Sequence, residues 1–358
     1  MKTLRERPRI LVVTLRRLGD VLLTTPLIHA LKLGFPGSSV DALVFRGTEG
    51  MLEGNRDLAH VIAVPQRPSA AEIGALIGRL WRRYDLAVAT HAGDRPTFLA
   101  WAAGRQRVGL LPAPDSGAWW KRRVFDDVVD PGSDNHRVIE LARIADVLGV
   151  PRRSEIVCPA GAIAPAAAPP GAYAVLHANP MFRIRRWTDE GWRALARALT
   201  DRRLTVIATG GPDPAEKDYL DRIWSASEPP VVRLDGKLGW PELTALLRGA
   251  AVYVGPDTSM THLAAGAGTP TVALYGPASP SLMGPWPVGG LETPWARAGT
   301  VQHRANVWVV QNPLPCMPCD RLGCDGHLES RSQCLDELPV QRVLAAVDQA
   351  LALRKAAA

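Results

Sequence analysis

The chain has 358 residues, 47% of them hydrophobic, and its formal net charge is +7. This length suffices for two domains of ordinary size, and the hydrophobic fraction argues against a disordered chain. The basic balance is compatible with nucleic acid, an anionic membrane face or phosphorylated small molecules as partners. The sequence has no zinc-finger spacing, no single basic helix and no aromatic RNA-binding motif, so we expect no nucleic-acid partner.

The sequence predicts neither a membrane span nor a signal peptide. No apolar run reaches the roughly 18–20 residues that cross a bilayer as a helix. The charged N-terminal residues lead directly into a strand pattern, without an apolar stretch before a cleavage site. We therefore expect a cytoplasmic protein.

The first half of the chain alternates between strand and helix patterns. Strands are predicted at residues 9–14, 40–45, 60–64, 84–90 and 106–110, and helices at residues 20–33, 70–83, 97–103 and 135–148. A basic, glycine-ended turn joins the first strand to the first helix, which Asp20 opens. Such alternation predicts an open, mostly parallel sheet with helices on both faces.

Residues 116–125 break this pattern because they join two tryptophans to three cations. The residues concerned are Trp119, Trp120, Lys121, Arg122 and Arg123. One interpretation places the tryptophans in the core. The other is a loop or interfacial segment in which the three cations bind the phosphates of an acceptor and the tryptophans meet lipid headgroups.

The Pro/Ala-rich residues 159–171 predict an interdomain linker, after which the alternation restarts. Strands are predicted at residues 172–177, 204–209, 231–234, 252–254 and 271–274, and helices at 187–199, 214–225, 240–247 and 338–353, with loop over 277–299. We expect an N-terminal domain over 1–160, a C-terminal domain over 172–336, and a helix in 337–358 that packs back across both. Ligands of doubly wound sheets bind at the carboxyl ends of strands, so we expect the site in a cleft between the domains.

Residues 253–277 read as strand, tight turn, helix and strand. Asp257, Thr258 and Ser259 are residue types that precede helices, and they leave free N–H groups at a positive helix end. Such a turn suits a diphosphate, with the carboxylate left to hold sugar hydroxyls. The alternative is an ordinary strand–helix–strand unit of any α/β protein.

Four of the five cysteines cluster near the C-terminus, and Cys158 stands alone. The clustered residues are Cys316, Cys319, Cys324 and Cys334. Four thiolates that include one C-x-x-C suit a tetrahedral zinc or iron with a structural role. The alternative is a loop of free, reduced thiols.

Three stretches resemble glycosyltransferase family 9, the bacterial heptosyltransferases. Residues 14–26 (TLRRLGDVLLTTP) resemble its N-terminal signature, residues 255–277 its donor-site signature, and residues 185–187 (RRW) its Lys/Arg-x-Trp loop. The resemblance implies the GT-B fold, in which two Rossmann-like domains face a central cleft. It implies inverting, metal-independent transfer of a heptose from ADP-heptose to the lipopolysaccharide inner core, without a catalytic cofactor.

The resemblance leaves several alternatives open. The four-cysteine tail also occurs in many members, and related heptosyltransferases that modify autotransporter proteins carry an iron-binding four-cysteine site. A protein acceptor is therefore an alternative to a phosphorylated, lipid-linked acceptor. The lipid-linked acceptor implies that the protein makes peripheral contact with the inner membrane. A nucleotide-sugar epimerase of GT-B architecture and a non-catalytic nucleotide-sugar-binding protein are further alternatives.

The resemblance also assigns roles to particular residues. Asp20 is expected to be the general base that takes the proton of the acceptor hydroxyl, and Arg185 the cation that meets the donor diphosphate. Asp257 is expected to bind the hydroxyls of the donor sugar. The other expected donor-binding residues are Thr258, Ser259, Met260 and Thr261 in the phosphate turn, His262 in support, and, by a loose alignment, Glu216 and Leu238 at ribose and adenine.

Overall fold

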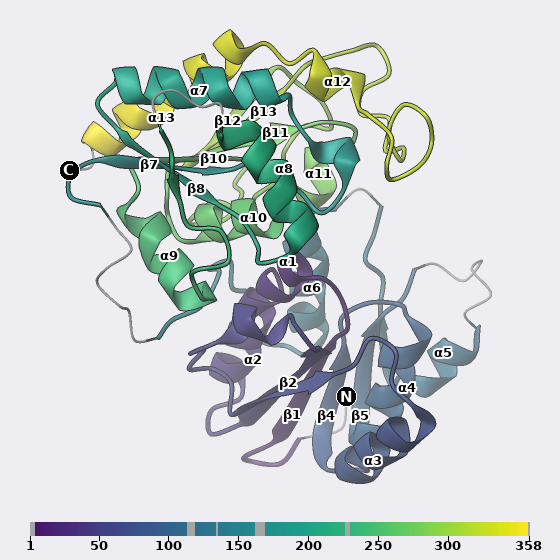
Figure 1. Cartoon of the computed structure of the whole chain (residues 1–358). Coiled ribbons are helices and arrows are strands. Elements are labelled where there is room, and N and C mark those ends of the chain that lie inside the picture. The colour runs from purple at the N-terminus through teal and green to yellow at the C-terminus, as the bar shows by residue number, and fades with distance from the viewer. Residues whose placement is uncertain (1–3, 113–118, 134, 162–168, 226–229, 357–358) are drawn as a thin grey trace. The chain divides into compact units, whose positions relative to one another are not determined.

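The computed structural model divides the chain into two compact units, Met1–Pro159 and Ala160–Ala358. It describes all residues except 1–3, 113–118, 134, 162–168, 226–229 and 357–358. Part of the predicted linker therefore lies outside the described residues. We treat each unit by itself (Figure 1).

The first unit is built on a six-stranded parallel sheet in the order β3-β2-β1-β4-β5-β6. Its strands are β1 (Arg9–Thr14), β2 (Ser39–Phe45), β3 (His60–Val64), β4 (Tyr84–Ala89), β5 (Gly104–Leu110) and β6 (Asp127–Val129). Its helical elements are α1 (Leu18–Leu22), α2 (Thr25–Gly34), η1 (Glu49–Leu52), α3 (Ala70–Leu80), α4 (Asp94–Ala103), α5 (Trp119–Val124) and α6 (Arg137–Val147). This strand order is that of the Rossmann fold, in which strands are added first on one side of β1 and then on the other. The place between the first and fourth strands, where the order switches sides, is the reversal point of the sheet.

The second unit follows the same order and adds one strand. Its sheet runs β12-β13-β11-β10-β7-β8-β9, and β12 pairs with β13 in the antiparallel sense. Its strands are β7 (Tyr173–His177), β8 (Thr205–Thr209), β9 (Val232–Arg233), β10 (Val252–Pro256), β11 (Thr271–Tyr275), β12 (Val301–Arg304) and β13 (Val307–Gln311). Its helical elements are η3 (Arg183–Arg185), α7 (Asp189–Asp201), α8 (Pro214–Trp224), α9 (Trp240–Gly249), α10 (Ser259–Gly266), α11 (Pro280–Met283), α12 (Gln333–Asp336) and α13 (Val340–Ala356). The reversal here lies between β7 and β10.

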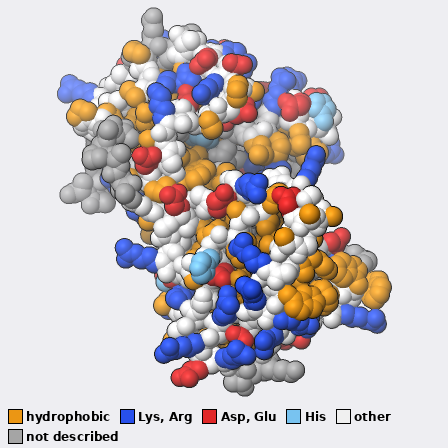
Figure 2. Space-filling view, turned by 60° about the horizontal axis from the view of Figure 1, so that its bottom comes forward, with side chains coloured by type: hydrophobic (Ala, Val, Ile, Leu, Met, Phe, Trp, Pro, Cys, Tyr) orange, Lys and Arg blue, Asp and Glu red, His pale blue; other side chains and the backbone are white. Residues whose placement is uncertain are grey.

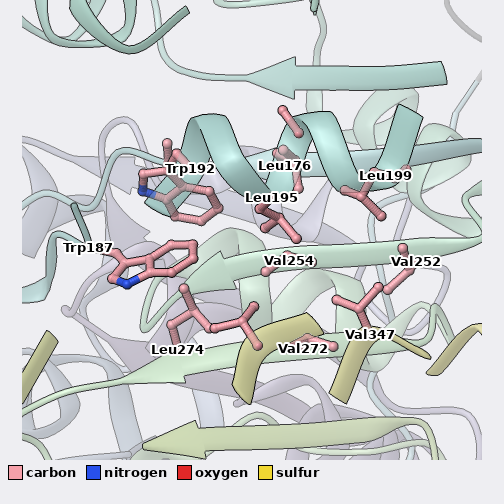
Figure 3. Packing of buried hydrophobic residues seen from close by; sticks show 14 of the residues in the cluster. Leu176, Trp187, Trp192, Leu195, Leu199, Val252, Val254, Val272, Leu274 and Val347 are labelled. Atoms are coloured by element: carbon pink, nitrogen blue, oxygen red, sulfur yellow. The ribbon is translucent and has the colours of Figure 1, made fainter. Parts of the chain in front are cut away.

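The central strands are buried on both faces, which explains their continuous apolar runs. In the second unit the inner side of α7 packs onto the sheet, and Trp187 and Trp192 meet edge to face with ring centroids 5.3 Å apart (Figure 3). The Trp187 Nε1 atom donates a hydrogen bond to the Leu338 carbonyl oxygen at 3.0 Å, which satisfies its polar atom. Helix α13 adds Val343 and Val347 to the same core. The expected packing of this helix across both domains stays a prediction.

The helix predicted over residues 20–33 is wrong in its bounds, because the chain forms α1 and α2 with a break between them. Pro26 explains the break. In a continuous helix its ring would clash with the Leu22 carbonyl, whereas a proline is well tolerated in the first turn of a new helix. Asp20 consequently lies inside the short helix α1 and does not open a long one.

Other differences concern the segments that were predicted as loops. The interfacial segment forms α5 where it is described, residues 280–283 form α11, and β6, β12 and β13 were not predicted. β13 has the sequence VWVVQ and is fully buried, but the many Pro and Gly residues before it obscured the signal. β10 also continues through Pro256, which pairs with Leu274 of β11. No helix within the described part of the chain is both long and apolar enough to cross a membrane.

Candidate functional site

The second unit brings Arg185 and Asp257 together at its reversal point. Arg185 lies in η3, in the loop after β7, and Asp257 directly follows β10. The Arg185 Nη1 atom lies 3.1 Å from the Asp257 Oδ2 atom and donates a hydrogen bond to the Asp257 carbonyl oxygen at 2.9 Å. These are the two residues that the sequence assigned to the donor diphosphate and the donor sugar. Their pairing places a cation and a carboxylate where ligands of such sheets bind.

The Asp257 carboxylate is buried, and its two oxygens differ. The Tyr275 hydroxyl contacts Oδ1 at 3.3 Å and the Met283 carbonyl oxygen at 2.7 Å, so its single proton serves the closer Met283 oxygen better. Burial, followed by the charge of Asp257, raises the pKa of Tyr275 well above its usual value, so the hydroxyl stays protonated. Among the described residues, none makes a well-aligned hydrogen bond to Oδ2, which leaves that oxygen able to accept one from a ligand.

The phosphate turn at the start of α10 has an open N-terminus. Thr258 is the N-cap residue, but its side chain makes no capping hydrogen bond. The hydroxyl of Thr261 donates to the Pro256 carbonyl oxygen at 2.5 Å, so this predicted ligand residue instead fixes the turn. Only Thr258 and Ser259 of the predicted turn residues have partly exposed side chains, whereas Met260, Thr261 and His262 are buried. Backbone N–H groups therefore carry most of the anion-binding capacity of this turn.

Glu216 lies beside the end of β8, next to β7 in the sheet. Its Oε1 atom accepts a hydrogen bond from the Gly211 N–H at 2.7 Å, which leaves its other oxygen for a ligand hydroxyl. His177, at the end of β7, contacts the Thr209 hydroxyl through Nδ1 at 3.1 Å. Burial lowers the pKa of His177, against the opposing effect of Glu216. The sequence did not single out His177. Leu238 is half-buried in the loop after β9.

The first unit places Asp20 at its own reversal point, between the ends of β1 and β4. Asp20 is only 6% exposed. The Arg16 Nε atom lies 2.5 Å from its Oδ1 atom, and the Arg137 Nε atom lies 3.8 Å from the same oxygen. Two positively charged arginines therefore face this carboxylate. Arg17 occupies the N-cap position of α1, where its side chain makes no capping hydrogen bond.

Arg137 is a functional candidate that sequence reasoning missed. It is buried at the start of α6, where its Nη2 atom donates to the Thr90 carbonyl oxygen at 2.8 Å and its Nη1 atom lies 3.1 Å from Glu140. Burial lowers the pKa of Arg137, and Asp20 opposes this effect. Nothing in the local sequence separates this arginine from the many others, because only the fold brings it to Asp20.

His91 is the second residue missed in this unit, and it directly follows Thr90 after β4. Burial, with the charges of Arg16 and Arg137, lowers the pKa of His91 to about 4. The imidazole is therefore neutral near pH 7. It adds no further positive charge beside Asp20.

The basic segment around α5 is only partly available to a ligand. The Lys121 Nζ atom donates to the Ala92 carbonyl oxygen at 2.7 Å and lies 2.6 Å from the Asp94 carboxylate. Arg122 donates to the Pro112 carbonyl oxygen. Arg123 is exposed and lies over the Trp119 ring at 5.1 Å. A core position for Trp119 is wrong, because this side chain is 63% exposed.

The four clustered cysteines do not fit a metal site in their present arrangement. Cys316 and Cys324 are exposed whereas Cys334 is buried. Among the described residues, no group of three or more His, Cys, Asp or Glu side chains is arranged to hold a metal ion. Burial, with smaller effects of the other three thiols, raises the pKa of Cys334 to about 12.

Two solved structures share the fold of this chain. The chain superposes on a family 9 glycosyltransferase from Veillonella parvula DSM 2008 with a TM-score of 0.76 and 18% identity, covering 96% of this chain and 97% of that one. It superposes on the E. coli heptosyltransferase WaaC with ADP with a TM-score of 0.72 and 20% identity, covering 96% and 99%. The protein therefore has the GT-B fold.

Sequence comparison gives the family. Residues 156–291 match the model of glycosyltransferase family 9 (heptosyltransferase). Lipopolysaccharide heptosyltransferase 3 of Escherichia coli is 26% identical over 287 residues, covering 75% of this chain and 83% of the relative. The chain therefore resembles the family 9 glycosyltransferases, which include the heptosyltransferases, and the resemblance found in the sequence is confirmed.

Proposed function

We propose that the chain transfers a heptose from ADP-heptose to an inner-core sugar of lipopolysaccharide or a related acceptor, with inversion and without a metal. The observation that carries this proposal is the Arg185–Asp257 pair beside the open N-terminus of α10. A cation, free N–H groups and an available carboxylate oxygen match the diphosphate and the hydroxyls of a nucleotide sugar. The E. coli heptosyltransferase WaaC, whose structure was solved with ADP, has the same fold, which supports this choice of nucleotide.

The second unit supplies the donor half of the mechanism. The bond between the sugar C1 and the diphosphate oxygen breaks, and its electron pair stays on the departing ADP. The Arg185 side chain is 31% exposed, and one of its guanidinium nitrogens contacts Asp257. Its other guanidinium N–H groups can therefore bind the diphosphate. Together with the N–H groups of α10, it stabilises the charge that develops on the leaving group.

The first unit supplies the acceptor half. The acceptor hydroxyl attacks C1 from the face opposite the diphosphate, which inverts the configuration, and its proton moves to the Asp20 carboxylate. Arg16 and Arg137 hold that carboxylate from two sides. We assign acceptor binding to this unit, with exposed Arg123 as a contact for acceptor phosphate, and nucleotide-sugar binding to the second unit. The proposed setting is the cytoplasmic side of the inner membrane.

The test is transfer from ADP-heptose to a truncated, water-soluble inner-core acceptor, read by mass spectrometry. We expect a mass gain of one heptose, and turnover about 10²–10⁴-fold lower in Asp20→Asn with donor affinity unchanged. Asp146→Asn is the matched control, because Asp146 pairs with Arg152 on the surface of the same unit. A folded Asp20→Asn variant with near wild-type turnover contradicts the base assignment. A donor that is isomerised without transfer contradicts the proposed function.

A further inference from the structure

The helix α3 in the first unit is an unusual surface helix. Its apolar residues Ile73, Leu76 and Ile77 are only half-buried, and Leu80 alone is fully buried. Its exposed positions are Ala70, Ala71, Glu72, Gly74, Ala75, Gly78 and Arg79. Most of these are small and uncharged, whereas the outer face of a helix on a water-facing surface is normally charged. The helix therefore presents incompletely covered apolar surface on its inner side and little charge on its outer side.

A hollow of about 280 Å³ lies along the inner side of α3, between that helix and α4. Its apolar lining includes Ile73, Leu76, Phe98 and Leu99. Three arginines and one carboxylate also line it, namely Arg46, Arg79, Arg95 and Glu72. The carboxylate is already engaged, because Glu72 accepts hydrogen bonds from the backbone N–H and the hydroxyl of Ser69. The hollow is therefore apolar in its interior and positively charged at its rim.

An exposed aromatic cluster continues this hollow onto the surface. Phe98, which lines the hollow, stacks on Trp101 with centroids 5.6 Å apart, and Trp81 meets Trp101 edge to face at 5.4 Å. Trp81 is 48% exposed and Phe98 is 41% exposed. Arg82 lies over the Trp81 ring at 5.9 Å. Figure 2 shows hydrophobic side chains gathered beside Lys and Arg side chains on the lower right of this surface.

We propose that the α3–α4 face, defined by Trp81, Phe98, Arg79 and Arg95, docks onto an anionic phospholipid bilayer. Tryptophan and arginine together match the boundary between headgroups and acyl chains, because the rings carry apolar area and the guanidinium groups meet lipid phosphates. The surrounding residues 66–107 contain seven arginines against three Asp or Glu residues, which gives the charge complementarity to an anionic leaflet. The aliphatic hollow fits hydrocarbon better than it fits a stacked base.

This inference deepens the proposed function, since a lipid-linked acceptor has its sugars at the same bilayer surface. It locates the docking face on α3 and α4, whereas the sequence pointed to the segment around α5. The two can be separated by mutation because their residues do not overlap.

Cosedimentation of the full chain with vesicles tests the proposal. We expect binding to vesicles of phosphatidylcholine with phosphatidylglycerol, and much weaker binding to phosphatidylcholine alone. The double variant Trp81→Ser, Phe98→Ser should bind about tenfold or more weakly, since it removes two interfacial aromatics. The double variant Arg79→Glu, Arg95→Glu should also bind vesicles about tenfold or more weakly than wild type. The difference in affinity should be larger at low salt, because the contacts that it removes are electrostatic.

The matched control is Val288→Ser, Leu322→Ser, which removes two apolar side chains that are 53% and 50% exposed in the second unit. It should bind vesicles as wild type does. Turnover with the water-soluble acceptor, measured without vesicles, should be unchanged in all these variants, so failure of the proposed function appears in a different assay from failure of docking.

Three outcomes would overturn the proposal. The first is a wild-type chain that does not bind anionic vesicles. The second is equal vesicle binding by wild type and both α3–α4 variants, with melting temperatures that show them folded. The third is vesicle binding that Arg123→Glu abolishes while the α3–α4 variants retain it, because the docking face would then lie at α5.

Discussion

Acid should destabilise the first unit through His91, and the size of the effect follows from its environment. The pKa of His91 is lowered from the ordinary value of 6.5 to about 4, chiefly by burial and then by the charges of Arg16 and Arg137. As the pH falls, the unfolded chain takes up the proton first. The stability is therefore complete above the unfolded value and is lost progressively between about pH 6.5 and pH 4. Between pH 7.5 and pH 5 the loss amounts to about 2 kcal/mol of unfolding free energy.

The variant His91→Gln isolates this effect. Glutamine has no proton to take up, so the change in unfolding free energy between the two pH values should be smaller than in wild type by about 2 kcal/mol. Urea unfolding is monitored by pulsed hydrogen exchange of peptides from β1 and β4, so the measurement reports on the first unit alone. His327→Gln is the control, because His327 lies in an exposed loop of the second unit. Equal acid sensitivity in wild type and a folded His91→Gln variant would refute the reasoning.

Three further predictions concern the other candidate residues. Arg185→Ala should weaken ADP binding by about 1.5–3 kcal/mol in calorimetry, because it removes a charge-assisted contact. Unchanged ADP affinity and turnover would show that Arg185 does not bind the donor. Arg123→Glu should raise the acceptor KM and leave donor binding unchanged. Lys121→Glu should mainly lower the melting temperature, because Lys121 is held by Ala92 and Asp94. A normal acceptor KM for Arg123→Glu would show that α5 does not bind the acceptor. Elemental analysis of protein purified with reductant and without chelator should find about one zinc or iron per chain if the four cysteines close around a structural metal, and finding none would favour free, reduced thiols.

Local sequence predicted those parts of the fold that depend on neighbouring residues. The central strands are apolar runs that can only be buried. The helix predicted over residues 187–199 forms as α7, and the Thr188 hydroxyl caps it by accepting a hydrogen bond from the Gly191 N–H at 3.0 Å. The 253–277 motif likewise gave β10, α10 and β11 in the right order. β13 was missed although its pattern is clear, because the preceding Pro and Gly residues directed the interpretation towards loop.

The parts of the site that could not be predicted depend on contacts between distant residues. Arg137 reaches Asp20 only because α6 follows β5 and β6 back across the sheet to the end of β1. Tyr275 reaches Asp257 because β10 and β11 are neighbours in the second sheet. The pairing of Arg185 with Asp257 was not predicted as a contact, although both residues were chosen. The sequence identified the chemistry of single residues better than their partners.

The shared strand order of the two units has a consequence for how the enzyme could be altered. Asp20 and His91 in the first unit, and Arg185 and Asp257 in the second, follow the first and fourth strands of their unit's own sheet, and each sheet has its own hydrophobic core. Chemistry is thus confined to a few turns, while the strands behind them are fixed by packing. On the proposed assignment of the acceptor to the first unit and the nucleotide sugar to the second, a chimaera that joins the first unit to the second unit of a relative should keep its choice of acceptor and exchange its choice of nucleotide sugar. Modularity of this kind would let donor and acceptor specificity diverge separately.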